Sequence, residues 1–231
     1  MWMSSEYRAA HAVYDSWDGI KALLLYVFSL LALVVQGRLY LSSMRMVVLE
    51  SLNMIVPLVT LAATLVAVWM SRERVVSIGM TKRHLGKSLA FGLALGCLLS
   101  AVLMASEMLV LGRVFSGLGA IHASLLLTFF VGALEEELAF RGYIGTRLRG
   151  IFSHRVAASL VTSGLFLLSH YAVFWGVSGT LSFEGISAMR IVFILLLHVV
   201  CDWTYQRTNC IWGAVALHFL YNIISGTMQF S

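Results

Sequence analysis

The sequence predicts an all-α membrane protein, a polytopic bundle of seven to eight transmembrane helices. The 231 residues are 60% hydrophobic and 12% charged, with a mean hydropathy of +0.89. This composition lies outside the range of soluble globular domains. Apolar runs of about 20 residues, the length needed to cross a bilayer, recur along the whole chain. These runs leave no room for a separate soluble domain, so residues 1–231 are interpreted as one integral membrane domain.

The first three predicted spans are strongly apolar. Residues 21–37 follow a mixed N-terminal stretch that lacks the compact apolar core of a cleavable signal peptide. Residues 47–70 contain Pro57, whose kink is tolerated in a membrane helix when a neighbouring helix or hydroxyl satisfies the freed carbonyl. Residues 86–111 contain GLALG, Gly92–Gly96, a GxxxG spacing that lets two helices approach closely.

The later spans are also apolar, but each one carries ionisable or amide side chains. An eighth helix is expected only if one of the long segments is split. The four spans are residues 122–146, 156–175, 185–204 and 210–228.

Basic residues predict the orientation, because short cytoplasmic loops retain Lys and Arg. The loop after the second span, SRERVVSIGMTKRHLGK, carries five of them, which indicates the cytoplasm and places the N-terminus there as well. The net charge of +5 follows from this topology and from anionic lipid, so the bilayer is an expected partner and nucleic acid is not. The compact chain with short loops predicts a prokaryotic plasma membrane. The arginines left on the outer side are Arg38, Arg45, Arg113 and Arg190.

The segment GALEEELAFRG places three glutamates and an arginine inside the fourth span. A charge at the bilayer centre costs roughly 2.5–3.5 kcal/mol, so these side chains must face the bundle interior. Glu137 and Arg141 are four residues apart, the favourable order for an ion pair on one helix face. Glu136 is turned about 100° away and has no cation within sequence reach, which suits a general base. Glu135 has no assigned role.

Two later spans place further polar groups at a similar depth. FLLSH ends at His170 in the fifth span, and HFLYN places His218 and Asn222 on one face of the last span. A single membrane histidine usually serves as a hydrogen-bonding group between helices. Polar groups on three spans at comparable depth instead predict that they meet Glu136 in one site.

Three motifs in this order resemble those of the CPBP intramembrane protease family, the type II CAAX prenyl protease and bacteriocin-processing (Abi) family. EELAFR, Glu136–Arg141, matches EExxxR, and FLLSH, Phe166–His170, matches FxxxH. HFLYN, His218–Asn222, matches HxxxN. The resemblance covers a protease core of about residues 122–225, whereas the first three spans match only in being apolar.

The resemblance implies an intramembrane endopeptidase that hydrolyses a peptide bond of a membrane-associated peptide or protein substrate. Glu136 and His170 would activate the water, and His218 with Asn222 would donate hydrogen bonds to the developing oxyanion. A structural and charge-balancing role falls to Glu137, Arg141 and Phe166.

No cofactor is expected, with zinc as the alternative. Glu136, His170 and His218 would form a set of two histidines and one glutamate that leaves a position for water. The HExxH signature of helical zinc sites is missing from the sequence. The metal-free reaction is therefore the prediction.

Two other classes of function remain open in the sequence. A non-proteolytic bacteriocin self-immunity or scaffolding protein and a proton-coupled transporter would also place carboxylates and histidines inside a membrane. His198 and Asp202, four residues apart in the sixth span, depart from the family pattern, and they are interpreted as a structural hydrogen bond, a second layer of the site or a proton path. The oligomeric state and the identity of the substrate do not follow from the sequence.

Overall fold

The computed structural model describes residues 3–42, 46–117, 119, 121–152 and 154–230, and they form an almost entirely helical bundle. Arg45, one of the predicted outer arginines, lies outside the described residues. The α-helices are α1 (Ser5–Ala10), α2 (Ser16–Ser42), α3 (Met46–Met70), α4 (Leu85–Leu111), α5 (Ala123–Glu136), α6 (Gly145–Arg147), α7 (Arg155–Ser178), α8 (Ala188–Thr208) and α9 (Trp212–Thr227). The remaining elements are the 3₁₀ turns η1 (Val75–Ile78) and η4 (Leu148–Gly150), the π-helix η3 (Glu137–Ile144), and the strands β1 (Arg113–Phe115) and β2 (Met228–Phe230).

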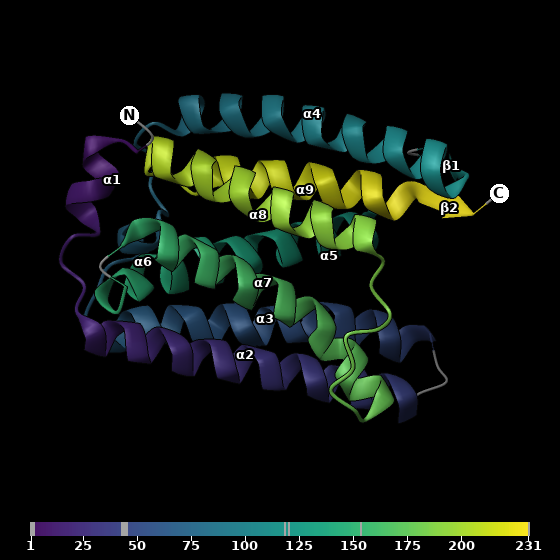
Figure 1. The fold of residues 1–231 in the computed structure, drawn as a ribbon, viewed down its shortest axis with the longest axis horizontal. Coiled ribbons are helices and arrows are strands. Elements are labelled where there is room, and N and C mark those ends of the chain that lie inside the picture. The colour runs from purple at the N-terminus through teal and green to yellow at the C-terminus, as the bar shows by residue number, and fades with distance from the viewer. Residues whose placement is uncertain (1–2, 43–45, 118, 120, 153, 231) are drawn as a thin grey trace.

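The long helices run side by side along the longest dimension of the molecule (Figure 1). α4, α8 and α9 form one side of the bundle, α2 and α3 form the other, and α5, η3 and α7 lie between them. α1 crosses the end where α6 lies, and the antiparallel pair of β1 and β2 lies at the opposite end. The central elements carry Glu136, Glu137, Arg141, Phe166 and His170, and α9 beside them carries His218 and Asn222.

The predicted bundle is confirmed in class but not in its number of membrane spans. Within the described residues, five helices are long and apolar enough to cross a bilayer: Ser16–Ser42, Ser51–Met70, Leu85–Leu111, Val156–Ser178 and Ala188–Thr208. The segment predicted at 122–146 is helical but changes from α to π geometry at Glu137. The last predicted span contains a helix of only 16 residues. Seven to eight spanning helices therefore remain a prediction.

Pro57 lies inside α3, which continues through it. Proline lacks the N–H that would bond the carbonyl four residues earlier, here that of Asn53. The hydroxyl of Thr60, one turn further on, lies 3.1 Å from the carbonyl oxygens of both Val56 and Pro57. The expected hydroxyl therefore lies near the proline. It bonds the carbonyls of Val56 and Pro57, however, and not the Asn53 carbonyl that the proline leaves without its helical partner.

The GxxxG pattern is confirmed as a close contact between α4 and α9. A Cβ on Gly92 would lie 2.0 Å from the carbonyl oxygen of Gly213, so the two backbones touch. Gly96 lies against the backbone of Leu217 in the same way. One turn before Gly92, the hydroxyl of Ser88 donates to the Cys210 carbonyl at 2.8 Å and accepts from the Gly213 amide at 2.9 Å. This contact fixes α9, and with it His218, against α4.

Arg147 closes the end of the bundle near α1. Its side chain is buried, pairs with Glu73 at 2.5 Å, and lies 3.9 Å from the ring centre of Tyr143. The same guanidinium donates at 3.2 Å to the carbonyls of Gly142 and Tyr143, at the end of η3. The Thr146 hydroxyl donates to the same two carbonyls, so the guanidinium and this hydroxyl together stabilise the helix end.

The α4 to α9 contact predicts opposite outcomes for two glycines of one helix. Gly92→Ala should destabilise the protein by about 1–3 kcal/mol, because the new methyl group overpacks against the Gly213 backbone. Gly86→Ala, where nothing lies within 4 Å of the new methyl, should stabilise α4 by about 0.5–1 kcal/mol. Reversible unfolding in detergent micelles measures both, and equal stability of the two variants would contradict the contact.

Candidate active site

The three consecutive glutamates point in three directions at the junction of α5 and η3. Successive helical residues are turned by about 100°, so each carboxylate meets different neighbours. Glu135 is buried on the side of Thr60 in α3. Glu136 has a side chain that is 30% exposed, and Glu137 is fully buried. The three carboxylates therefore differ in burial, and Glu136 is the most exposed of them.

Glu137 forms the predicted ion pair with Arg141. Its Oε1 atom lies 3.0 Å from Nη1 of Arg141, and both side chains are completely buried. The same Oε1 accepts a hydrogen bond from Nδ1 of His218 in α9 at 2.7 Å. The sequence did not predict this second contact, because nothing in the spacing of the two motifs relates position 137 to position 218. One buried carboxylate therefore joins α9 to η3.

The segment from Glu137 to Ile144 is a π-helix, whereas the sequence predicted an uninterrupted α-helix. π-helical turns are rare and frequently lie at functional sites. Gly142 lies in this segment against η1, where a Cβ would come within 2.7 Å of the Ile78 carbonyl oxygen. Glu137 and Arg141 form their ion pair within the π-helix. The ion pair was therefore predicted correctly, although the helix type was not.

Phe166 of α7 lies at the centre of the polar residues. The guanidinium carbon of Arg141 lies 4.2 Å from its ring centre, a distance at which a desolvated cation–π contact contributes about 2 kcal/mol. The ring centres of His170, His198 and His218 lie 4.8, 5.3 and 6.4 Å from that of Phe166. Phe166 is thus the apolar surface against which the cation and the three imidazoles pack.

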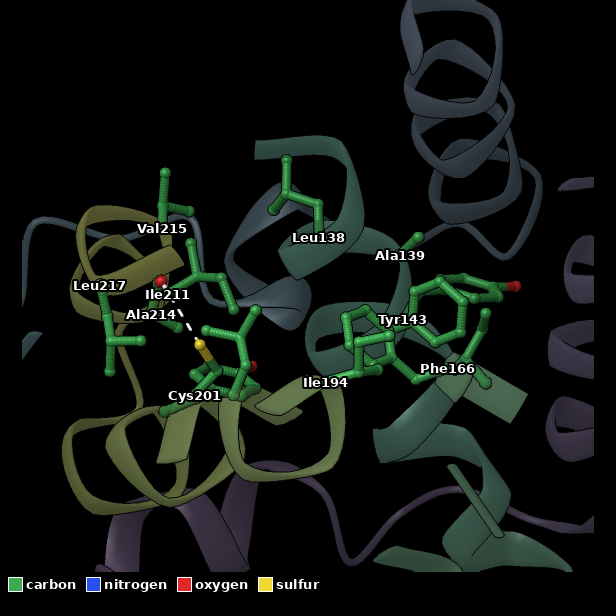
Figure 2. Packing of buried hydrophobic residues seen from close by; sticks show 14 of the residues in the cluster. Leu138, Ala139, Tyr143, Phe166, Ile194, Cys201, Ile211, Ala214, Val215 and Leu217 are labelled. Carbon is green, nitrogen blue, oxygen red and sulfur yellow. Dashed lines mark hydrogen bonds between the residues drawn. The ribbon is translucent and has the colours of Figure 1, made fainter. Parts of the chain in front are cut away.

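The close view in Figure 2 places this centre within the hydrophobic core. Phe166 lies beside Tyr143 of η3 and Ile194 of α8, while Cys201 of α8 points toward Ala214 of α9. The thiol of Cys201 donates to the Ala214 carbonyl at 3.7 Å. The core therefore holds η3, α7, α8 and α9 together around the polar groups.

His170 has a defined orientation. Its Nδ1 lies 2.8 Å from the carbonyl oxygen of Phe166, and only a protonated nitrogen can donate to a carbonyl. In the neutral ring this leaves Nε2 as an unprotonated acceptor. The side chain is half-buried, so His170 can accept a hydrogen bond from water through Nε2.

His218 lies between two carboxylates. Nδ1 donates to Glu137, and Nε2 lies 3.7 Å from Oε2 of Glu136. That Glu136 oxygen has no hydrogen-bond partner among the described residues. Asn222 follows His218 by one turn of α9 and is half-buried. A free carboxylate oxygen, an imidazole and an amide thus lie on adjoining helix faces.

Glu136, His170 and His218 were the residues of the alternative zinc site. Among the described residues no three His, Cys, Asp or Glu side chains form a group that could hold a metal ion. The metal-free reaction and the zinc alternative both stay predictions.

The neutralisation of Glu137 predicts a specific pattern of stability. Arg141→Met leaves a buried carboxylate without its cation and should destabilise the protein by about 3–5 kcal/mol. The double variant Glu137→Gln, Arg141→Met should recover a large part of this loss, because the amide oxygen still accepts from His218 and no charge is left unpaired. Unfolding of the wild type, of Arg141→Met, of Glu137→Gln and of the double variant in bicelles measures the coupling, and a double-variant loss equal to the sum of the two single losses would contradict the ion pair.

Comparison with known proteins was made against family models, curated proteins and solved structures. Residues 118–224, just under half of the chain, match the family model described as type II CAAX prenyl endopeptidase Rce1-like. No curated protein and no solved structure matches the chain. The matched segment contains Glu136, Phe166, His170, His218 and Asn222, so the predicted family is confirmed.

Proposed function

Because residues 118–224 of the chain belong to the Rce1-like type II CAAX prenyl endopeptidase family, we propose that the protein is an intramembrane endopeptidase that uses a glutamate-activated water. The observation that carries this proposal is the pairing pattern of the adjacent glutamates. Glu137 is neutralised by Arg141 and His218, whereas Glu136 keeps an unpartnered oxygen on a partly exposed side chain. A carboxylate in that state can act as a general base.

In the proposed reaction Glu136 accepts a proton from water while Nε2 of His170 accepts the second hydrogen bond of the same water. The oxygen attacks the carbonyl carbon of the scissile peptide bond, and the carbonyl oxygen becomes an oxyanion. Glu136 then transfers its proton to the leaving amine as the carbon–nitrogen bond breaks. The immediate products are a carboxylic acid and an amine, which become a carboxylate and an ammonium group when the acid proton passes to the amine, and Glu136 returns to its starting charge.

His218 and Asn222 are proposed to stabilise the oxyanion. Donation from Nδ1 of His218 to Glu137 means that Nε2 carries a proton only in the imidazolium form, and the proposed reaction uses this form. The Asn222 amide supplies a second donor from the same helix. Preorganised donors of this kind are worth on the order of 3 kcal/mol each, which makes this pair the largest expected term.

The proposed substrate is a peptide or protein segment attached to the membrane. Glu136 lies at a helix junction within an apolar bundle, so a substrate reaches it from lipid or from the membrane surface rather than from bulk water. We further propose a prokaryotic plasma membrane and a cytoplasmic N-terminus, because the end formed by α1, η1 and α6 carries the basic loop.

Glu136→Gln should lower the cleavage rate by a factor on the order of 10²–10⁴, the range for loss of a general base. Glu135→Gln is the matched control, because it removes the same charge one residue away on the α3 side and should retain activity. Both are measured in proteoliposomes with a farnesylated CAAX peptide and its unprenylated counterpart. Comparative peptidomics of cells with the wild type or Glu136→Gln identifies the natural substrate.

Unaltered cleavage by both Glu136→Gln and His170→Ala would refute the peptidase proposal. If a cellular phenotype survives both substitutions while no peptide differs, a scaffolding or immunity function takes its place. Solute flux in proteoliposomes would instead support transport.

Removal of metal ions should leave the cleavage rate within about twofold, because the proposed charge stabilisation comes from protein donors. Activity is measured after dialysis against a strong chelator, with elemental analysis of the same preparation. Stoichiometric zinc together with chelator-sensitive cleavage would overturn the metal-free reaction.

A further inference from the structure

His198 of α8 is buried in an unusual way. Its side chain is 1% exposed, and neither ring nitrogen has a hydrogen-bond partner among the described residues. Burial of a polar group without a partner is unfavourable, so an apolar residue would fit this position at a lower free energy. A partner outside the protein's own side chains is the usual explanation of such a group, most often an internal water.

Further unpartnered atoms lie at Arg141, which contacts the same Phe166 ring. The guanidinium of Arg141 packs on that ring, and its Nε and Nη2 atoms have no hydrogen-bond partner among the described residues. The ring centre of His198 lies 5.3 Å from that of Phe166, so the two groups share one aromatic neighbour. Two donors of Arg141 and both nitrogens of His198 thus lack partners around one aromatic ring.

A small polar cavity lies one helical turn from this cluster. It is lined by Gly145, Arg149, Ser159, Thr162 and Asp202 and has a volume of about 10 Å³, which is close to the space that one water molecule requires. Three helical segments each contribute one residue that lines the cavity and one residue of the cluster formed by Arg141, Phe166 and His198. The two residues of each segment are four positions apart in the sequence. The pairs are Gly145 with Arg141, Thr162 with Phe166, and Asp202 with His198.

Because one helical turn rises by about 5.4 Å, this repeated spacing places the cavity next to the cluster along the bundle axis. On α8 the polar residues continue in the same direction, since Gln206 follows Asp202 by four positions. Oδ2 of Asp202 accepts from Ser159 at 3.0 Å and from Gln206 at 2.6 Å. The Gln206 carbonyl accepts from the backbone amide of Ser4, in the segment that leads into α1.

We propose that His198, Asp202 and Arg141 bind a chain of internal waters that runs from the α1 end of the bundle to the buried side of the catalytic cluster. One water occupies the cavity at Asp202, and the next lies between His198 and Arg141. This path follows α8 from Gln206 through Asp202 to His198, whereas Glu136 lies at the junction of α5 and η3. The catalytic consequence rests on the proposed function, with His198 acting as a positioning residue that holds the water beside Arg141.

Hydroxyl-radical labelling of the wild-type protein in lipid nanodiscs tests the water chain without any measurement of activity. Radicals produced from a bound water oxidise the adjacent side chain, so His198 should be labelled although it is buried. Phe193 is the matched control, because it is an oxidisable side chain buried on the same helix and lies outside both the cavity and the cluster. Labelling of His198 well above Phe193 supports the proposal, and equal protection of both overturns it.

The role in catalysis is tested by His198→Leu and His198→Asn in the proteoliposome assay. Leucine cannot bind the water, so kcat should fall about tenfold while KM stays within twofold. Asparagine keeps a donor and an acceptor and should restore most of kcat, which a merely space-filling role would not produce. Thr204→Val is the control, since this buried hydroxyl of α8 bonds only the Val200 carbonyl of its own helix, and it should leave both constants unchanged.

The outcomes separate this proposal from the proposed function. Full activity of His198→Leu overturns the catalytic role of His198, even when Glu136→Gln is inactive. Undiminished cleavage by Glu136→Gln refutes the peptidase proposal, while the labelling of His198 still decides whether the water chain exists. Where His198→Leu does not fold, the labelling of the wild type decides.

Discussion

The fully buried carboxylate of Glu137 is the interaction on which the rest of the site depends. An isolated charge in the interior of a membrane protein is too costly to persist, so the fold must bring cations or donors to it. Arg141 comes from the same helix and His218 comes from α9, and both reach the same oxygen. The orientation of His218 then places its second nitrogen toward Glu136. A structural ion pair therefore determines where the acid–base groups lie.

The predictability of this arrangement differs from residue to residue. The free-energy cost of a charge in the membrane and the four-residue spacing were sufficient to predict the pair of Glu137 and Arg141. This interaction is local, and the residues that share a helix face follow from their spacing in the sequence. The bond from His218 to Glu137 joins positions 81 residues apart, and no local pattern contains it. The π-helical geometry of η3 was also missed, since LAFRGYI has no feature that separates a π-turn from an α-turn. His198 was noticed as an anomaly, but its packing against Phe166 required the tertiary structure.

Helices outside the family segment hold the site from both sides. The α4 backbone at Gly92 contacts Gly213 of α9, and η1 packs against Gly142 of η3. Glu73, which lies just before η1, pairs with Arg147 beyond the end of η3. The first three spans match the family only in being apolar, yet they supply the surfaces that fix the two ends of the helices on which the candidate site residues lie. Their sequences need only small residues and a few polar contacts at defined positions.

A π-helical turn contains one more residue than the α-helical turn that it replaces, so the eight residues of η3 are constrained in number as well as in type. Deletion of a single residue would allow an ordinary α-helix to form, with no loss of backbone hydrogen bonding. Because the wider turn accommodates one residue, such a deletion would leave the orientation of the residues beyond it nearly unchanged, with Arg147 still facing Glu73. The effect would instead be local, since a deletion between Glu137 and Arg141 would shorten the spacing of that ion pair from four residues to three.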